Sequence, residues 1–133
     1  YSGAVKDRQE LLLKNLDSEI ASQSQIALTN AVGIAGNSAV IYGLYDHQDT
    51  VLWQIVKVNY EQYVKRAHMP GIGLAIFDAN LKKVANSGVD VDVKSIPAEA
   101  QTKIHFQKEG GYVQAQVPVP YGDKIIGLVV MLL

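Results

Sequence analysis

The sequence predicts an α+β fold, in which a long N-terminal helix and a helix pair pack on an antiparallel sheet of about five strands. Helical periodicity without any proline fills the first half of the chain, and short apolar strands separated by turn residues fill the second half. Helices followed by strands are typical of this class. The 133 residues suit a single domain with a sizeable core.

The first predicted element is a helix over residues 5–37, approximately. Apolar side chains recur there at steps of three, four or seven and so share one face: Leu13, Leu16, Ile20, Ala27, Ala31 and Ile34. About 30 helical residues span roughly 45–50 Å, which is longer than a compact domain of this size needs. We therefore expect the polar N-terminal part to extend beyond the core or to pair with a second copy of the chain.

A helix pair is predicted over residues 38–67. The first helix is short and apolar and ends near Tyr45, and Asp49 is expected to be the N-cap of the second. Pro70 stops the second helix, because proline cannot continue one. Steps of three and four along the second helix place four residues on one face: Trp53, Val56, Tyr60 and Tyr63.

The sheet is predicted over residues 72–133. A first strand from Ile72 to Phe77 is followed by a turn that begins at Asp78 and by a second strand that includes Val84. The segment that opens at Pro97 is expected to be a short helix. A long hairpin over residues 110–133 follows, with small and β-branched residues alternating on one face of its first strand: Val113, Ala115, Val117 and Val119. The last strand is apolar on both faces, so we expect it to be central and covered on both sides.

Composition argues against several kinds of site. The chain has no cysteine, which removes disulfides, thiolate metal ligands, cysteine nucleophiles and the attachment motif of c-type haem. A formal net charge of −1 leaves no overall field to attract nucleic acid. The three histidines form neither an HxxxH nor an HxH pair, and neither a G-x-S-x-G motif nor a phosphate loop is present. We therefore predict neither an enzyme, nor a metal site, nor a cofactor.

Aromatic residues are unusually dense around the helix pair, and tyrosine outnumbers phenylalanine seven to two. Aromatic walls with polar tips are typical of small-molecule pockets, although packing in a core or an interface would explain the same residues. A buried Arg66 would need an anion, whereas an exposed one would not. The predicted ligand-binding residues are Tyr42, Tyr45, Trp53, Tyr60, Tyr63, Arg66, His68, Phe77, Asp78 and Tyr112. Lys82 and Lys83 are interpreted as solvated charges beside the turn.

The order of these segments resembles the Cache domain, the PAS-like extracytoplasmic sensor domain of bacterial methyl-accepting chemotaxis receptors and of some sensor kinases. Two stretches carry the resemblance: the apolar strand that ends at Asp78 with the following "ANLKKVANSG", and the closing "VPVPYGDKIIGLVVMLL". Each stretch alone is unspecific, but together with the helices they cover nearly the whole chain in order.

The resemblance implies a domain between two transmembrane helices on the periplasmic side, and a homodimer along the first helix. It places the ligand between the sheet and the helical segment over it. We therefore expect residues 1–133 to be one sensor domain excised from a longer membrane receptor. The arginine–tryptophan–tyrosine spacing of the members that bind amino acids is missing, so a small carboxylate or another small polar metabolite is the expected ligand.

Three other interpretations remain open from the sequence. The chain could be a PAS-like regulator in the cytosol, or the sensor domain of a histidine kinase. It could also be a dimerisation module whose aromatic residues only pack against one another. An enzyme comes last, since no catalytic set of residues is found.

Overall fold

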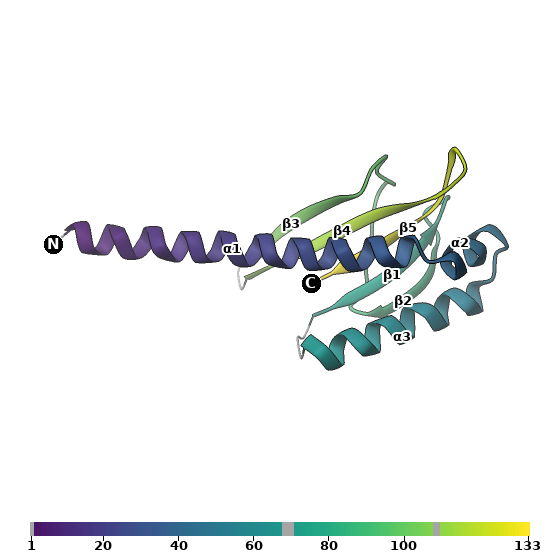
Figure 1. Ribbon diagram of the computed structural model, residues 1–133, viewed down its shortest axis with the longest axis horizontal. Coiled ribbons are helices and arrows are strands. Elements are labelled where there is room, and N and C mark those ends of the chain that lie inside the picture. The colour runs from purple at the N-terminus through teal and green to yellow at the C-terminus, as the bar shows by residue number, and fades with distance from the viewer. Residues whose placement is uncertain (1, 68–70, 108–109) are drawn as a thin grey trace.

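The computed structural model of the chain describes residues 2–67, 71–107 and 110–133, and the side chains of residues 18–65, 71–105 and 111–133. The described residues form three helices and five strands (Figure 1). In chain order these are α1 (Ser2–Ala35), α2 (Ser38–Tyr45), α3 (Asp49–Ala67), β1 (Gly73–Asp78), β2 (Lys83–Gly88), β3 (Gln101–Gln107), β4 (Gly110–Tyr121) and β5 (Lys124–Leu132). The predicted α+β class is therefore confirmed.

The five strands form one antiparallel sheet in the order β2-β1-β5-β4-β3. The central strand is β5, in which Val130 lies opposite Ala75 of β1 on one side and Gln116 of β4 on the other. From Gly127 onward every residue of β5 is buried. A strand that is apolar on both faces needs cover on both faces, and the prediction of a central last strand is confirmed.

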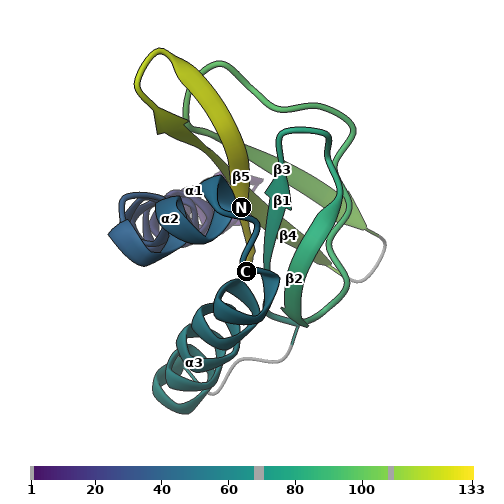
Figure 2. The same cartoon turned by 90° about the vertical axis from the view of Figure 1, so that its right-hand side faces the viewer.

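All three helices cover the same face of the sheet (Figure 2). The long α1 lies along β4 and β5, whereas α3 lies along β2 and β1. The larger part of the core fills this interface; it includes Ala31, Val56, Leu74, Ile76 and Val129. Burial of these aliphatic side chains is the main contribution that stabilises the fold.

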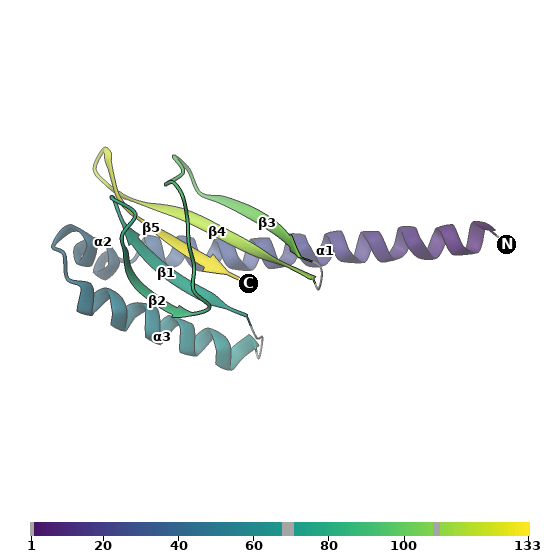
Figure 3. The ribbon, with the colours of Figure 1, turned by 180° about the vertical axis from the view of Figure 1, so that it is seen from behind.

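The other face of the sheet is covered by the connection between β2 and β3, residues 89–100 (Figure 3). Val91 is fully buried there against a second, smaller apolar cluster that includes Phe77 and Leu128. Lys83 of β2 pairs with Asp90 and, at 3.2 Å, with Asp92, which ties the connection to the sheet. The hydrogen bond to Asp90 is the main cause that raises the pKa of Lys83.

Two predictions about local structure are wrong. The segment at Pro97 forms no helix; the chain instead enters β3 at Gln101, whose side chain donates a hydrogen bond to Gln116 of β4. The free edge of β4 needs backbone partners, and β3 supplies them. Asp49 is the first residue of α3 rather than its N-cap, because the carbonyl oxygen of Gln48 accepts the bonds from Val51 and Leu52.

The predicted apolar stripe of α1 is confirmed where its side chains are described. Ala27, Ala31 and Ile34 are buried against the sheet, and Ile20 is half-buried. The side chains of Leu13 and Leu16 lie outside the described part. The N-terminal half of α1 projects beyond the sheet (Figure 1), as its length predicted.

The short α2 approaches the sheet very closely at Gly127 of β5. A methyl group added there would lie 2.6 Å from Cδ1 of Leu44 and 2.7 Å from the carbonyl oxygen of Phe77. Asn37 ends the preceding connection and caps α2, since its side chain accepts a hydrogen bond from the backbone N–H of Ala39 at 2.9 Å. These contacts fix the end of α2 relative to β1 and β5.

Candidate functional site

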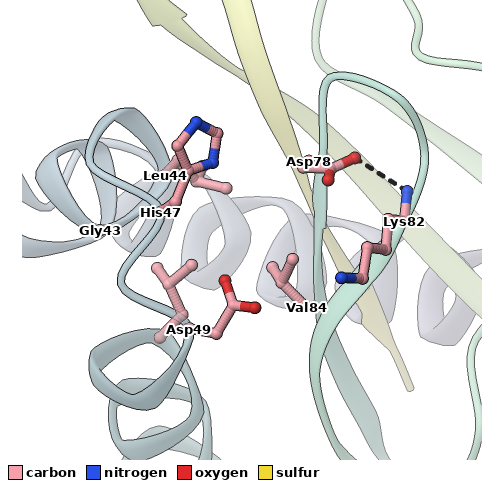
Figure 4. Close-up of a pocket in the computed structure, with 8 residues that line it drawn as sticks. Gly43, Leu44, His47, Asp49, Asp78, Lys82 and Val84 are labelled. Carbon is pink, nitrogen blue, oxygen red and sulfur yellow. Dashed lines mark hydrogen bonds between the residues drawn. The ribbon is translucent and has the colours of Figure 1, made fainter.

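A pocket of about 150 Å³ lies between the connection from α2 to α3 and the turn from β1 to β2 (Figure 4). We call it the polar pocket. The α2–α3 connection and the β1–β2 turn lie at the end of the molecule opposite the projecting N-terminal part of α1 (Figure 1). The lining of the polar pocket is Gly43, Leu44, His47, Asp49, Leu52, Asp78, Lys82 and Val84.

The polar pocket combines an apolar floor with charged walls. Leu44, Leu52 and Val84 are buried and form the floor. Figure 4 shows the carboxylate of Asp49 and the amino group of Lys82 pointing toward one another across the opening. Among the described residues, neither side chain forms a hydrogen bond or an ion pair. Both charges are therefore available to a ligand.

Asp78 organises the turn that carries Lys82. Its Oδ1 accepts hydrogen bonds from the backbone N–H groups of Asn80 and Lys82, both at 2.9 Å. The backbone N–H of Asp78 also donates to the carbonyl oxygen of Lys82 at 2.9 Å. One carboxylate oxygen is thus committed to the turn, as is common for aspartate in such positions. Asp78 was predicted to bind the ligand. Its other carboxylate oxygen, Oδ2, accepts neither of these two hydrogen bonds and lies where it can contact a ligand.

The walls of the polar pocket contain strained backbone on both sides. His47 has a φ of 53° and Leu81 a φ of 62°, and these are the two non-glycine residues with positive φ in the described chain. His47 follows the C-cap of α2, where the N–H of Gln48 donates to the carbonyl oxygen of Gly43 at 2.8 Å. That bond is typical of a Schellman motif, in which glycine is usual at the position of His47.

Replacing His47 with glycine is expected to raise the free energy of unfolding by about 1 kcal/mol, because an L side chain in the left-handed region costs roughly that much. Chemical denaturation in urea measures the change. Ala79→Gly is the matched control, since Ala79 is an exposed turn residue without a positive φ. The account is contradicted if the two glycine substitutions have the same effect.

The structure brings two of the predicted ligand-binding residues together at this end of the molecule. Tyr45 lines an adjoining pocket that also contains Asp78. Tyr42 and Trp53 are 65% and 51% exposed and line neither pocket. The side chain of Arg66 and the whole of His68 lie outside the described residues.

Tyr60 and Tyr63 lie elsewhere, in the interface between α3 and the sheet. Both are half-buried and line a cavity of about 20 Å³, which is too small for a metabolite. Burial raises the pKa of the Tyr63 phenol. These two tyrosines act as packing residues.

Phe77 and Tyr112 do not face the helices, so the expected cleft between them and the helix pair is not formed. Successive residues of a strand point to opposite faces. Because Ile76 packs under the helices, Phe77 lies on the other face, beside Leu128, and Tyr112 belongs to the apolar cluster of that same face. The structure therefore does not bring Phe77 and Tyr112 together with the described aromatic residues of the helix pair.

A wider depression of about 410 Å³ lies on that other face and includes Tyr112 and Asp90. The carboxylate of Asp90 is already paired with Lys83. Tyr112 stacks on His105 with ring centroids 4.7 Å apart. Since this depression lacks an unpaired charge of a described residue, the polar pocket is the better candidate for a polar ligand.

Sequence reasoning missed three polar side chains of the polar pocket: His47, Asp49 and Lys82. Lys82 was interpreted as a solvated charge and Asp49 as a helix cap, and His47 was not singled out as a ligand-binding residue. Lys82 is far from His47 and Asp49 in the sequence, and only the Schellman motif after α2 and the Asp78 turn bring the three together. The motif signals themselves, a polar residue after a short helix and Asp-Ala-Asn after a strand, are visible in the sequence.

The described residues contain no group of three or more His, Cys, Asp or Glu side chains that could hold a metal ion. Within the same ranges no single helix is long and apolar enough to cross a membrane. One bent pair of helices, Ser18–Ala35 and Ser38–Tyr45, which meet at 61°, satisfies the criteria of length and composition.

Comparison of the chain with models of known protein families and with curated proteins gave no match.

Proposed function

We propose that the chain is the extracytoplasmic ligand-sensing domain of a transmembrane chemoreceptor and binds a small polar metabolite in the polar pocket. One observation carries the proposal: the charges of Asp49 and Lys82, which pair with no other described residue, face one another above an apolar floor. A few convergent polar groups in a mostly apolar concavity are typical of ligand sites.

The charges of the polar pocket indicate the chemistry of the ligand. Asp49 and Oδ2 of Asp78 can accept hydrogen bonds from an ammonium group, and Lys82 can donate to a carboxylate. A zwitterion would satisfy both sets of groups, and a small carboxylate would satisfy Lys82 alone. Charge-assisted hydrogen bonds of this kind are stronger than neutral ones.

Binding at this site would couple two parts of the fold. Asp49 lies on the helix pair, whereas Asp78 and Lys82 lie on the hairpin of β1 and β2. A ligand that contacts both would favour one spacing between them, and only its differential affinity for that spacing can shift the equilibrium. Because α2 is joined to α1 through Gly36 and Asn37 alone, a shift of α2 would reach α1 directly.

The relay that we propose uses α1. The N-terminal end of α1 and the C-terminal end of β5 point toward the same side of the molecule (Figure 1), as a domain that signals to a membrane on that side requires. Ile26 and Val32 of α1 are 41% and 48% exposed, on the part of the helix surface that the sheet leaves uncovered. We include in the proposal a homodimer through α1, in which these side chains would be covered.

The test is thermal stability of the domain across small carboxylates, amines, amino acids and amides. A ligand that binds only the native state stabilises it by about 2.7 kcal/mol at 100 times its dissociation constant. We expect a shift for at least one of these compounds. Its affinity should fall at least tenfold in Lys82→Gln if it is a carboxylate, in Asp49→Asn if it is an amine, and in both variants if it is an amino acid.

Lys57→Gln is the matched control, because Lys57 is an exposed lysine of α3 outside the polar pocket. It should bind as the wild type does. Absence of any shift across the four classes, or equal losses in Lys57→Gln and Lys82→Gln, would refute the proposal.

A further inference from the structure

A second pocket, of about 190 Å³, adjoins the polar pocket on the side of the β4–β5 turn. We call it the tyrosine pocket. Its lining is Leu44, Tyr45, His47, Asp78, Ala79, Asn80 and Ile126. Leu44, His47 and Asp78 also line the polar pocket, so the two cavities meet at these three residues.

Tyr45 is the aromatic residue in the lining of the tyrosine pocket, and a tyrosine from a distant segment supports it. Tyr45, at the end of α2, stacks on Tyr121 of the β4–β5 hairpin with ring centroids 4.5 Å apart and planes inclined by 27°. The two tyrosines nevertheless remain 54% and 42% exposed. Their stacking therefore leaves apolar surface that a further group could cover.

The two pockets differ in chemistry. The polar pocket contains Asp49 and Lys82, and neither of these residues lines the tyrosine pocket. In the tyrosine pocket, Leu44 and Ile126 complete an apolar surface beside Tyr45, and the Oδ1 of Asp78 is committed to backbone N–H groups. A cavity of roughly 150 Å³ is large enough for one benzene ring, so the tyrosine pocket has room for a ring of that size.

We infer that the ligand has two parts: a charged head that binds between Asp49 and Lys82, and a flat apolar group, such as an aromatic ring, that covers Tyr45. This inference rests on the proposed function, since it assumes that the head binds in the polar pocket. It assigns Tyr45 as the residue that selects ligands with an aromatic group. A ligand with only a small head would leave the tyrosine pocket empty.

Three pairs of probes test the inference, each pair sharing its charged head: acetate and phenylacetate, ethylamine and 2-phenylethylamine, glycine and phenylalanine. Calorimetric titration measures the affinity of each probe. For the head that binds, the phenyl member is expected to bind at least about tenfold more tightly, because its ring leaves water.

Tyr45→Ala should remove this advantage and leave the affinity for the phenyl-free member unchanged, and Tyr45→Phe should keep it. Tyr42→Ala is the matched control, since Tyr42 is an exposed tyrosine of α2 that lines neither pocket. Circular dichroism of each variant checks that it is folded. Tyr121→Ala, which removes the stacking partner of Tyr45, should weaken only the phenyl members.

The outcomes separate the two claims. Equal affinities within a pair that binds, or a phenyl advantage that survives Tyr45→Ala, overturn the inference and leave the proposed function standing. Phenyl members that bind equally well to wild type, Asp49→Asn and Lys82→Gln overturn the proposed function and the placement of the head together. Failure of all six probes to bind argues against both.

Discussion

Replacing Gly127 with alanine is expected to lower the free energy of unfolding by about 1–3 kcal/mol, the usual cost of forcing an extra methyl group into a packed core. The added carbon would lie 2.6 Å from Leu44 and 2.7 Å from the backbone oxygen of Phe77. Leu44 can move by rotating its side chain, but the carbonyl oxygen belongs to the paired strand β1 and cannot. Because Leu44 lines the polar pocket, the substitution should also weaken ligand binding.

Gly33→Ala is the matched control, because a methyl group added at Gly33 of α1 meets no atom within 4 Å. The same chemical change should there raise the free energy of unfolding by about 0.5–1 kcal/mol, since alanine has the higher helix propensity. Urea denaturation of both variants measures the difference. Effects of the same sign would contradict the close approach of α2 to β5.

Replacing Ile76 with alanine is expected to lower the free energy of unfolding by about 2–5 kcal/mol, because the side chain is fully buried and its loss leaves a cavity. Ile76 lies in β1, on the face that the helices cover, within the main core cluster. The surrounding strands are paired on both sides of β1, so the site can collapse little. Denaturation in guanidinium chloride measures the loss.

Ile125→Ala provides the comparison, since Ile125 is the second residue of β5 and 39% of its surface is exposed. We expect a loss of less than about 1 kcal/mol there, because less apolar area leaves contact. If Ile76→Ala lowered the free energy of unfolding no more than Ile125→Ala does, the result would contradict the packing of the helices on β1.

Much of the fold could be predicted because hydrophobic periodicity reports burial. The steps of three and four in α1 predicted the burial of Ala27, Ala31 and Ile34, and the structure confirms it. The alternation in β4 correctly placed Val113 and Val117 on a buried face. These patterns are local, so a single sequence is enough to read them.

The errors arise where the outcome depends on tertiary contacts. Residues 101–107 form a strand because the edge of β4 needs a partner, and nothing local to Pro97 indicates that. Ile76 and Phe77 are both apolar, so the pattern could not decide which of them faces the helices. The position of Lys82 and Asp49 in one pocket also depends on a tertiary contact, between a turn and a helix end. The sequence therefore did not predict it.

The central claim, that a small ligand binds at the end of the molecule formed by α2 and the β1–β2 turn, is tested most directly by nuclear magnetic resonance. The isotope-labelled domain is titrated with the compound that gives the largest thermal shift, and the amide signals that move are mapped. The account predicts that they cluster at residues 43–52 and 78–84, around His47 and Lys82. Shifts confined to the opposite face, around Tyr112 and Asp90, would contradict it.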